Sequence, residues 1–141
     1  KYKNYTDRNI TNFQKWNKIF RKDKKVLKHE VVPNDDIVAE ASKLISYVNN
    51  NRLAKIPEVC FEFYDKNEVF KLDLNKNIGS FLKIEEINQE NVAGILPSEE
   101  FYFFLKHPWG ADTLNITSCF EVKNHELWKK ALIYKDQLYD R

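Results

Sequence analysis

The spacing of apolar residues divides this chain into helical and strand-like stretches. After Pro33, apolar residues recur every three or four positions, which predicts a helix. Asn34 or Asp35 can cap its start, and the run 49–51 ends it, since Asn tolerates the left-handed conformation found at helix ends. The predicted core-facing side of this helix consists of Ile37, Ala41, Leu44, Ile45 and Val48.

The next part of the chain alternates between apolar and polar residues, which is the pattern of β-strands. Residues 59–64 and 69–74 form a predicted hairpin, and the turn residues of 65–67 join its two strands. Two further strands are predicted at 80–87 and 91–96, and the first of these is the less regular.

A short helix is predicted after Pro97, because Ser98 is a good N-cap and two glutamates follow it. The run 101–105 makes this helix apolar nearly all round, so it must be covered on several sides or face a ligand. Residues 107–110 then end it, through a proline and a glycine.

The last part of the chain predicts one more strand and one more helix. Alternation over 111–122 predicts a strand with Leu114, Ile116 and Phe120 facing inward, and Asn124 can cap the final helix. The whole order is α, α, β, β, β, β, α, β, α. It predicts an α+β fold, with helices packed around a largely antiparallel sheet of about five strands.

The first 33 residues differ from the rest of the chain. An early helix is predicted there, and its largely aromatic side consists of Ile10, Phe13, either Trp16 or Asn17, and Phe20. This side either covers the domain core or docks on a further domain or a membrane surface. The chain is therefore divided into a basic, aromatic helical segment at 1–33 and an α+β domain at 34–141.

Composition narrows the class of protein. With 141 residues, 43% of them hydrophobic and 31% charged, the chain matches one soluble globular domain. No apolar run approaches the ~20 residues of a membrane-spanning helix. The net charge of +2 is too small to imply nucleic acid as a partner. The chain has no Met and begins without a signal peptide, so we expect a fragment or a processed product, located in the cytoplasm.

No combination of residues matches a catalytic or metal-binding pattern. The three histidines lack the spacing of a helical zinc pair, and the three glycines are too isolated for a phosphate loop. Cys60 and Cys119 are expected in strands as reduced, structural thiols. An enzyme would require His107, Asp112 and Cys119 to meet in a cleft. We predict no catalytic residue, no metal and no cofactor.

The run from Phe101 to Trp109 has the best claim to function. If its helix lines a cavity, a lipid, an acyl chain or a sterol could enter past Trp109. The predicted walls of that pocket are Phe61, Phe63, Phe70, Phe101, Phe104, Leu105, Trp109 and Leu114. If side chains fill the cavity, an interface with a partner is expected instead, and it would consist of Phe13, Trp16, Phe20 and Trp109.

Three segments resemble the sterol carrier protein 2-like domain. The hairpin 59–74 looks like the opening pair of that family, whose second strand often reads aromatic, x, Leu, Asp. Residues 92–101 are similar to its strand that ends in Ser and passes into a helix with a Phe and a Leu, and 114–122 look like its closing strand. The resemblance covers about 56–138. It implies an apolar tunnel and lipid carriage.

Domains of that family also occur as C-terminal appendages of enzymes with a metallo-β-lactamase fold, such as alkyl sulfatases and relatives of sialic acid hydroxylases. The resemblance therefore also implies an accessory role beside an upstream enzyme. We predict a non-catalytic accessory or interaction domain, a C-terminal fragment of a larger protein, with an apolar-ligand carrier as the alternative. Its expected partner is an upstream domain or another protein, and a homodimer stays open.

Overall fold

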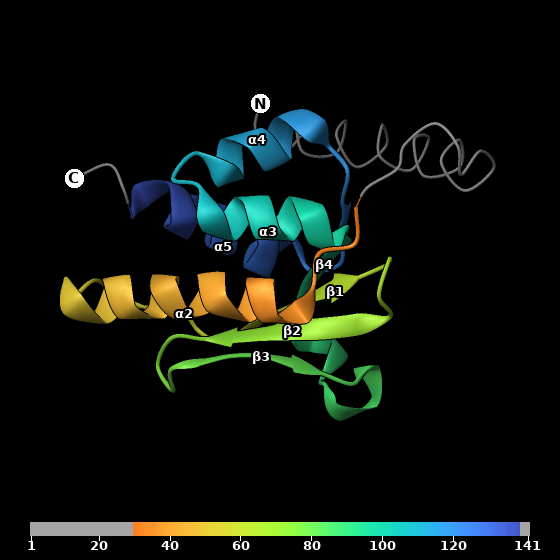
Figure 1. The fold of residues 1–141 in the computed structure, drawn as a ribbon, viewed down its shortest axis with the longest axis horizontal. Coiled ribbons are helices and arrows are strands. Elements are labelled where there is room, and N and C mark those ends of the chain that lie inside the picture. Colours follow the sequence, from red (N-terminus) through yellow and green to blue (C-terminus); the bar gives the residue numbers. More distant parts are fainter. Residues whose placement is uncertain (1–29, 139–141) are drawn as a thin grey trace.

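A computed structural model of the chain describes residues 30–138 (Figure 1). These residues form four α-helices and a five-stranded sheet, which confirms the predicted α+β class. The helices are α2 (Asn34–Asn50), α3 (Ser98–Lys106), α4 (Gly110–Thr117) and α5 (His125–Gln137). The strands are β1 (Val59–Phe63), β2 (Glu68–Asp73), β3 (Ile78–Leu82), β4 (Val92–Leu96) and β5 (Glu121–Val122). The predicted aromatic helix with Phe13, Trp16 and Phe20 lies outside the described residues.

The strands lie in the order β3-β2-β1-β4-β5, so β1 is the centre of the sheet. Strands β1, β2 and β3 form consecutive antiparallel hairpins, and β5 pairs antiparallel with β4. The pair β1 and β4 is parallel, in which Phe61 lies opposite Gly94. A parallel pair needs a crossover. Here the chain between β3 and β4 provides it, with two short 3-10 turns at 84–86 and 89–91 where the sequence predicts strand up to residue 87.

The sheet is covered on both faces at its centre. On one face lies the main core, which α2, α3 and α5 cover (Figure 1). On the other face, Cys60, Val69 and Val92 form a small apolar cluster, against which Ile84 and Ile87 of the crossover pack. The crossover therefore closes the face of the sheet on which residues 30–138 place no α-helix.

Phe101 of α3 occupies the middle of the main core. Its ring centroid lies 4.8 Å from that of Phe61, 5.2 Å from Phe63 and 5.4 Å from Phe70. All four side chains are buried. Aromatic pairs at these separations contribute about 0.5–1.5 kcal/mol each beyond the area that they bury. Phe101 thus fixes α3 against three positions of the hairpin.

The prediction of a strand over 111–122 is wrong, because most of this stretch is the helix α4. At Gly110 an added Cβ would lie 2.6 Å from the Cα and the carbonyl oxygen of Phe104, so the backbone of α4 passes very close to α3. Ala111 and Leu114, three residues apart, bury one side of α4. Ser118 ends the helix in the left-handed conformation, and only Glu121 and Val122 are left as strand.

Ser98 begins α3 as predicted, yet its side chain makes a different contact from the predicted cap. Ser98 is fully buried, and no side-chain cap bond forms at this helix end. Its Oγ donates to Asp65 Oδ2 (2.7 Å), and its backbone N–H donates to Asp65 Oδ1 (3.0 Å). The same Oγ accepts from the N–H of Val32 (3.0 Å). Ser98 therefore ties the start of α3 to the β1–β2 turn and to the chain before α2.

Asn34, which the sequence predicts as a cap at the start of α2, makes no side-chain cap bond there and contacts the β1–β2 hairpin instead. Its Nδ2 donates to Glu68 Oε2 (3.0 Å), and its Oδ1 accepts from Lys66 Nζ (2.5 Å). At the other end of α2, the left-handed position belongs to Arg52 and not to an asparagine of 49–51. The predicted cap of α5 is confirmed, since Asn124 Oδ1 accepts from the N–H of Leu127 (3.2 Å).

We expect Ser98→Ala to lower the free energy of unfolding by about 1–3 kcal/mol, because it leaves the half-buried Oδ2 of Asp65 and the N–H of Val32 without their partner. Ser46→Ala, on the exposed side of α2, is the matched control and should change stability by no more than about 0.5 kcal/mol. Urea denaturation of both variants measures the difference. Equal stabilities would show that the Ser98 bonds add nothing.

Candidate interaction surface

Most of the predicted pocket walls lie inside the core. The buried ones, each at most 3% exposed, are Phe61, Phe63, Phe70, Phe101, Phe104, Leu105 and Leu114. They belong to one continuous cluster, in which their side chains pack on one another. The structure therefore brings seven of the eight predicted residues together, as packing partners.

A cavity borders this cluster between α2, α5 and the sheet. Phe61, Phe104 and Lys135 are among the side chains that line it. Its volume of about 10 Å³ matches the space of one water molecule. An acyl chain or a sterol needs a pocket of several hundred Å³.

Trp109, the eighth predicted residue, lies on the surface with 55% of its area exposed. Its ring stacks on that of His107, with centroids 5.0 Å apart and planes at 19°. The His107 ring in turn lies 4.2 Å from that of Phe103 on α3. These three rings form a ladder across the junction of α3 and α4, and we call it the aromatic ladder.

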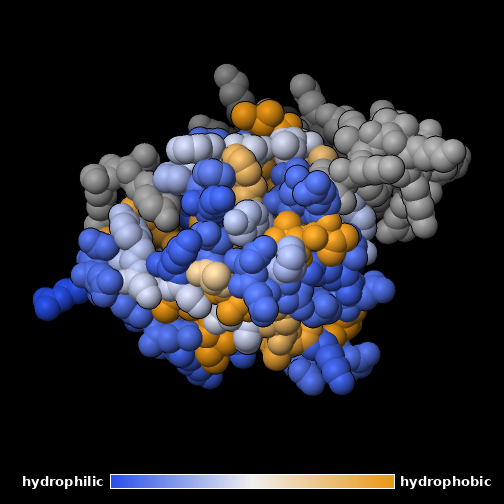
Figure 2. Space-filling model, viewed as in Figure 1, coloured by the Kyte–Doolittle hydropathy of each residue, from blue (hydrophilic) through white to orange (hydrophobic). Residues whose placement is uncertain are grey.

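The outer side of α4 continues this surface. Ile116 is 82% exposed, the highest value among the large hydrophobic side chains of the described residues. It follows Trp109 by seven residues, about two helical turns, so both lie on the same side of α4. Figure 2 shows hydrophobic atoms over α4 at the top of the molecule. The aromatic ladder and Ile116 together are called the α4 surface below. The prediction that Ile116 faces inward is wrong, because it assumed a strand.

Lys135 of α5 supports this surface from inside. It is only 1% exposed, and its Nζ donates to the carbonyl oxygen of His107 (2.6 Å) and lies 5.7 Å from the ring centroid of Phe104. Burial lowers the pKa of Lys135 from its ordinary 10.5 to about 8, although neighbouring Asp136 acts to raise it. The bond holds the turn between α3 and α4, which carries His107 and Trp109.

Sequence reasoning missed Lys135 because its position gives little warning. A lysine in a helix with charged neighbours is the usual composition of a solvated face. One signal was available, since Trp128, Ala131 and Lys135 are spaced three and four residues apart on the buried side of α5.

His107, Asp112 and Cys119, which an enzyme would need in one cleft, lie in three different surroundings. His107 stacks in the aromatic ladder, Asp112 is exposed on α4, and Cys119 follows α4 with its Sγ 3.4 Å from the Thr117 carbonyl oxygen. Burial and, less strongly, Glu100 raise the pKa of Cys119 to about 11, which disfavours a nucleophilic thiolate. Cys119 lies outside any strand, contrary to the prediction. Within residues 30–138 no group of three or more His, Cys, Asp and Glu is placed to hold a metal ion.

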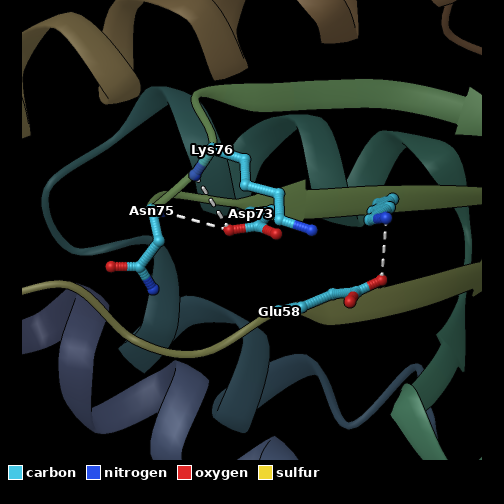
Figure 3. A network of polar contacts seen from close by, with 5 residues as sticks. Glu58, Asp73, Asn75 and Lys76 are labelled. Atoms are coloured by element: carbon cyan, nitrogen blue, oxygen red, sulfur yellow. Dashed lines mark hydrogen bonds and ion pairs between the residues drawn. The ribbon is translucent and has the colours of Figure 1, made fainter.

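A polar network lies beside the β1–β2 hairpin (Figure 3). Lys71 Nζ contacts Glu58 Oε1 at 3.0 Å. Asp73 is only 4% exposed, and its Oδ1 accepts from the N–H groups of Asn75 and Lys76, both at 3.1 Å. A carboxylate that bonds the backbone two residues on is a turn-forming contact. The network therefore closes the β2–β3 turn.

The two partners of the Lys71–Glu58 contact have opposite effects on the pKa of Cys60. Burial is the main cause that raises the pKa of Cys60 to about 11, with Glu58 adding to it and Lys71 opposing it. Cys60 is fully buried, as the prediction of a structural thiol requires, and both cysteines are free.

Comparison with protein-family models, with curated proteins and with solved structures finds no match to this chain. No helix among the described residues is long and apolar enough to cross a membrane.

We expect the stability of the wild type, relative to Lys135→Met, to rise between about pH 8 and pH 10.5. The folded-state pKa of Lys135 is about 8, so in this range the unfolded chain binds a proton that the folded chain has lost, and rising pH favours folding. The raised pKa values of Cys60, Cys119, Tyr64 and Tyr134 act in the opposite direction, and they cancel in the difference between the two proteins.

Thermal or urea denaturation at half-unit pH steps measures this difference. Lys130→Met, at an exposed position of α5, controls for the loss of a lysine. Parallel stability curves for the wild type and Lys135→Met would show that folding does not lower the pKa of Lys135.

Proposed function

We propose that this chain is a non-catalytic interaction domain that binds a protein partner, or a further domain of the same protein, through the α4 surface. One observation carries the proposal: Trp109 and Ile116 are 55% and 82% exposed, and both lie on the same side of α4. The core beneath α4 is packed with side chains. Tryptophan is enriched among the residues that dominate binding energy at interfaces.

The geometry beneath Trp109 supports this role. Its ring rests on His107, and the carbonyl of His107 accepts the bond from Lys135, so the side chain is held before any partner arrives. An anchor that is already ordered loses less conformational entropy on binding. Asp112 and Thr113, between Trp109 and Ile116 on α4, add polar groups to the apolar contact. The free thiols are consistent with the cytoplasmic location that we propose.

The apolar-ligand carrier has weaker support. A lipid would have to separate the rings of Phe61, Phe101 and Phe104, whose centroids lie 4.8–6.1 Å apart. Membership of the sterol carrier protein 2-like family remains a proposal. It is supported by the hairpin and by the passage from β4 into α3, whereas the third resembling segment, 114–122, is helical for its first half.

We expect native mass spectrometry of the purified chain to show the protein mass without a bound apolar molecule. The reason is the cavity of about 10 Å³, which holds no more than a water molecule. Spectra before and after denaturation make the comparison. A lipid that is released on denaturation would favour the carrier over the interaction domain.

We expect Trp109→Ala and Ile116→Ser each to weaken binding of the partner by at least about tenfold, since truncating an anchor at the centre of an interface commonly costs 2 kcal/mol or more. Ile133→Ser is the matched control, because Ile133 is also exposed but lies on α5. Quantitative affinity capture with all four proteins identifies partners that the wild type and the control retain. Calorimetry with such a partner then measures the affinities.

Circular dichroism must show equal thermal midpoints for the four proteins, so that lost binding reflects the surface. If the same proteins bind equally to the wild type and both α4 variants, the α4 surface is not the docking site.

A further inference from the structure

Exposed hydrophobic side chains gather at the end of the domain where α3 begins. Val31 and Tyr64 are 59% and 42% exposed. The residue after each of them is bonded to Ser98, the first residue of α3: the N–H that follows Val31 donates to Ser98 Oγ, and the carboxylate of Asp65 accepts from Ser98. Val31 and Tyr64 therefore lie on either side of the start of α3.

The end of α4 reaches the same place. Thr117, the last residue of α4, donates from its Oγ1 to Glu100 Oε2 (3.2 Å) in the first turn of α3. Ile116, 82% exposed, precedes it. From Ile116 the α4 surface continues to Trp109, about 10 Å along the helix at 1.5 Å per residue. Exposed hydrophobic side chains thus extend from the start of α3 to the far end of α4.

The chain enters the described part of the domain at this end (Figure 1). The N–H of Glu30 donates to Glu99 Oε2 (3.0 Å), so residues 1–29 are attached beside the end of α4. Between Phe20 and Glu30, the run 21–29 can span about 30 Å when extended. Helix α4 has eight residues and is about 12 Å long. The apolar side that the sequence predicts for the segment can therefore reach the whole α4 surface.

The spacing of the apolar residues matches on the two sides. Phe13 and Phe20 are seven residues apart, as are Trp109 and Ile116. In helices, both pairs are separated by about two turns. Because the segment is attached at the Ile116 end, Phe20 meets Ile116 and Phe13 meets Trp109.

Charge favours the same contact. The run 21–28 holds five basic residues and one acidic residue. The surface that it must cross carries Asp65, Glu99 and Glu100 around the start of α3, and Asp112 is the one charged residue of α4. Opposite charges steer the approach of two surfaces and suppress the wrong partners.

We infer that residues 1–29 of this chain cover the α4 surface, with Phe20 on Ile116 and Phe13 on Trp109, until a partner displaces them. The segment then regulates the binding proposed above, on which this inference rests. A segment on a short tether has an effective concentration in the millimolar range, so it competes with any partner in solution. This tether selects the segment over a second copy or an unrelated protein.

Acrylamide quenching of the full chain tests the contact. In a Trp16→Phe background the emitting residues are Trp109 and Trp128, and Trp128 is only 4% exposed. Adding Phe13→Asp and Phe20→Asp should raise the quenching constant at least about twofold, because the segment no longer covers Trp109 in most molecules. An unchanged constant would overturn the inference.

The matched control is the pair Thr11→Asp and Lys18→Gln in the same background. It changes the net charge by the same amount, on the opposite side of the predicted helix, and should quench like its parent. In Ile116→Ser the two phenylalanine substitutions should add little, since the contact is already weakened. A control that quenches as strongly as the phenylalanine pair, or quenching of the parent that falls as protein concentration rises, would also overturn the inference. The second result would indicate a contact between copies.

Partner binding separates this inference from the proposed function. By calorimetry, Phe13→Asp with Phe20→Asp should bind a partner identified above about tenfold more tightly, because no competing segment has to leave. Equal affinity, with Trp109→Ala still weakening the complex, would overturn the competition and leave the docking site standing. Increased quenching together with a partner that ignores Trp109→Ala would support the intramolecular contact and contradict the proposed function.

Discussion

The ring of Phe101 is the contact on which the rest of this domain depends. It lies against Phe61, Phe63 and Phe70 at once, so a single side chain of α3 meets both strands of the central hairpin. A core packed in this way has little free volume, and the one cavity described beside it is the size of a water molecule. Helix α4 packs on α3 and α5 beyond this core, and it presents its far side to solvent (Figure 1).

Elements with a local signal could be predicted from the sequence. The apolar stripe of α2, the alternation of β1 and β2 and the cap of α5 all depend on residues close in the chain. Helix α4 could not be predicted, because the run Thr-Leu-Asn-Ile-Thr is rich in β-branched residues and alternates like a strand. Its helical form depends on the close approach of Gly110 to Phe104, which is a tertiary contact. The parallel pair of β1 and β4 is equally non-local.

The surface was harder to predict than the core. Apolar character selected seven residues that do lie together, but it could not show that they would fill the space between them. Trp109 could be identified from the sequence as a surface anchor. The hydrogen bond from Lys135 to His107, which holds the turn beneath Trp109, could not be predicted, because it joins residues 28 positions apart. Ile116 was assigned to the wrong face, because an error in element type changes the side to which every second residue points.

The contacts of Ser98 and Asn34 have a mechanical consequence. The chain at 30–34 is joined to Glu99 and Ser98 at the start of α3 and to Lys66 and Glu68 at the neighbouring β1–β2 turn, so it is attached to two elements at once. A pulling force applied to the chain before residue 30 would load these bonds before it reached the rest of α2. The domain would then resist stretching from that end until the whole set of attachments ruptures in one step, and α2 would not be peeled away one turn at a time.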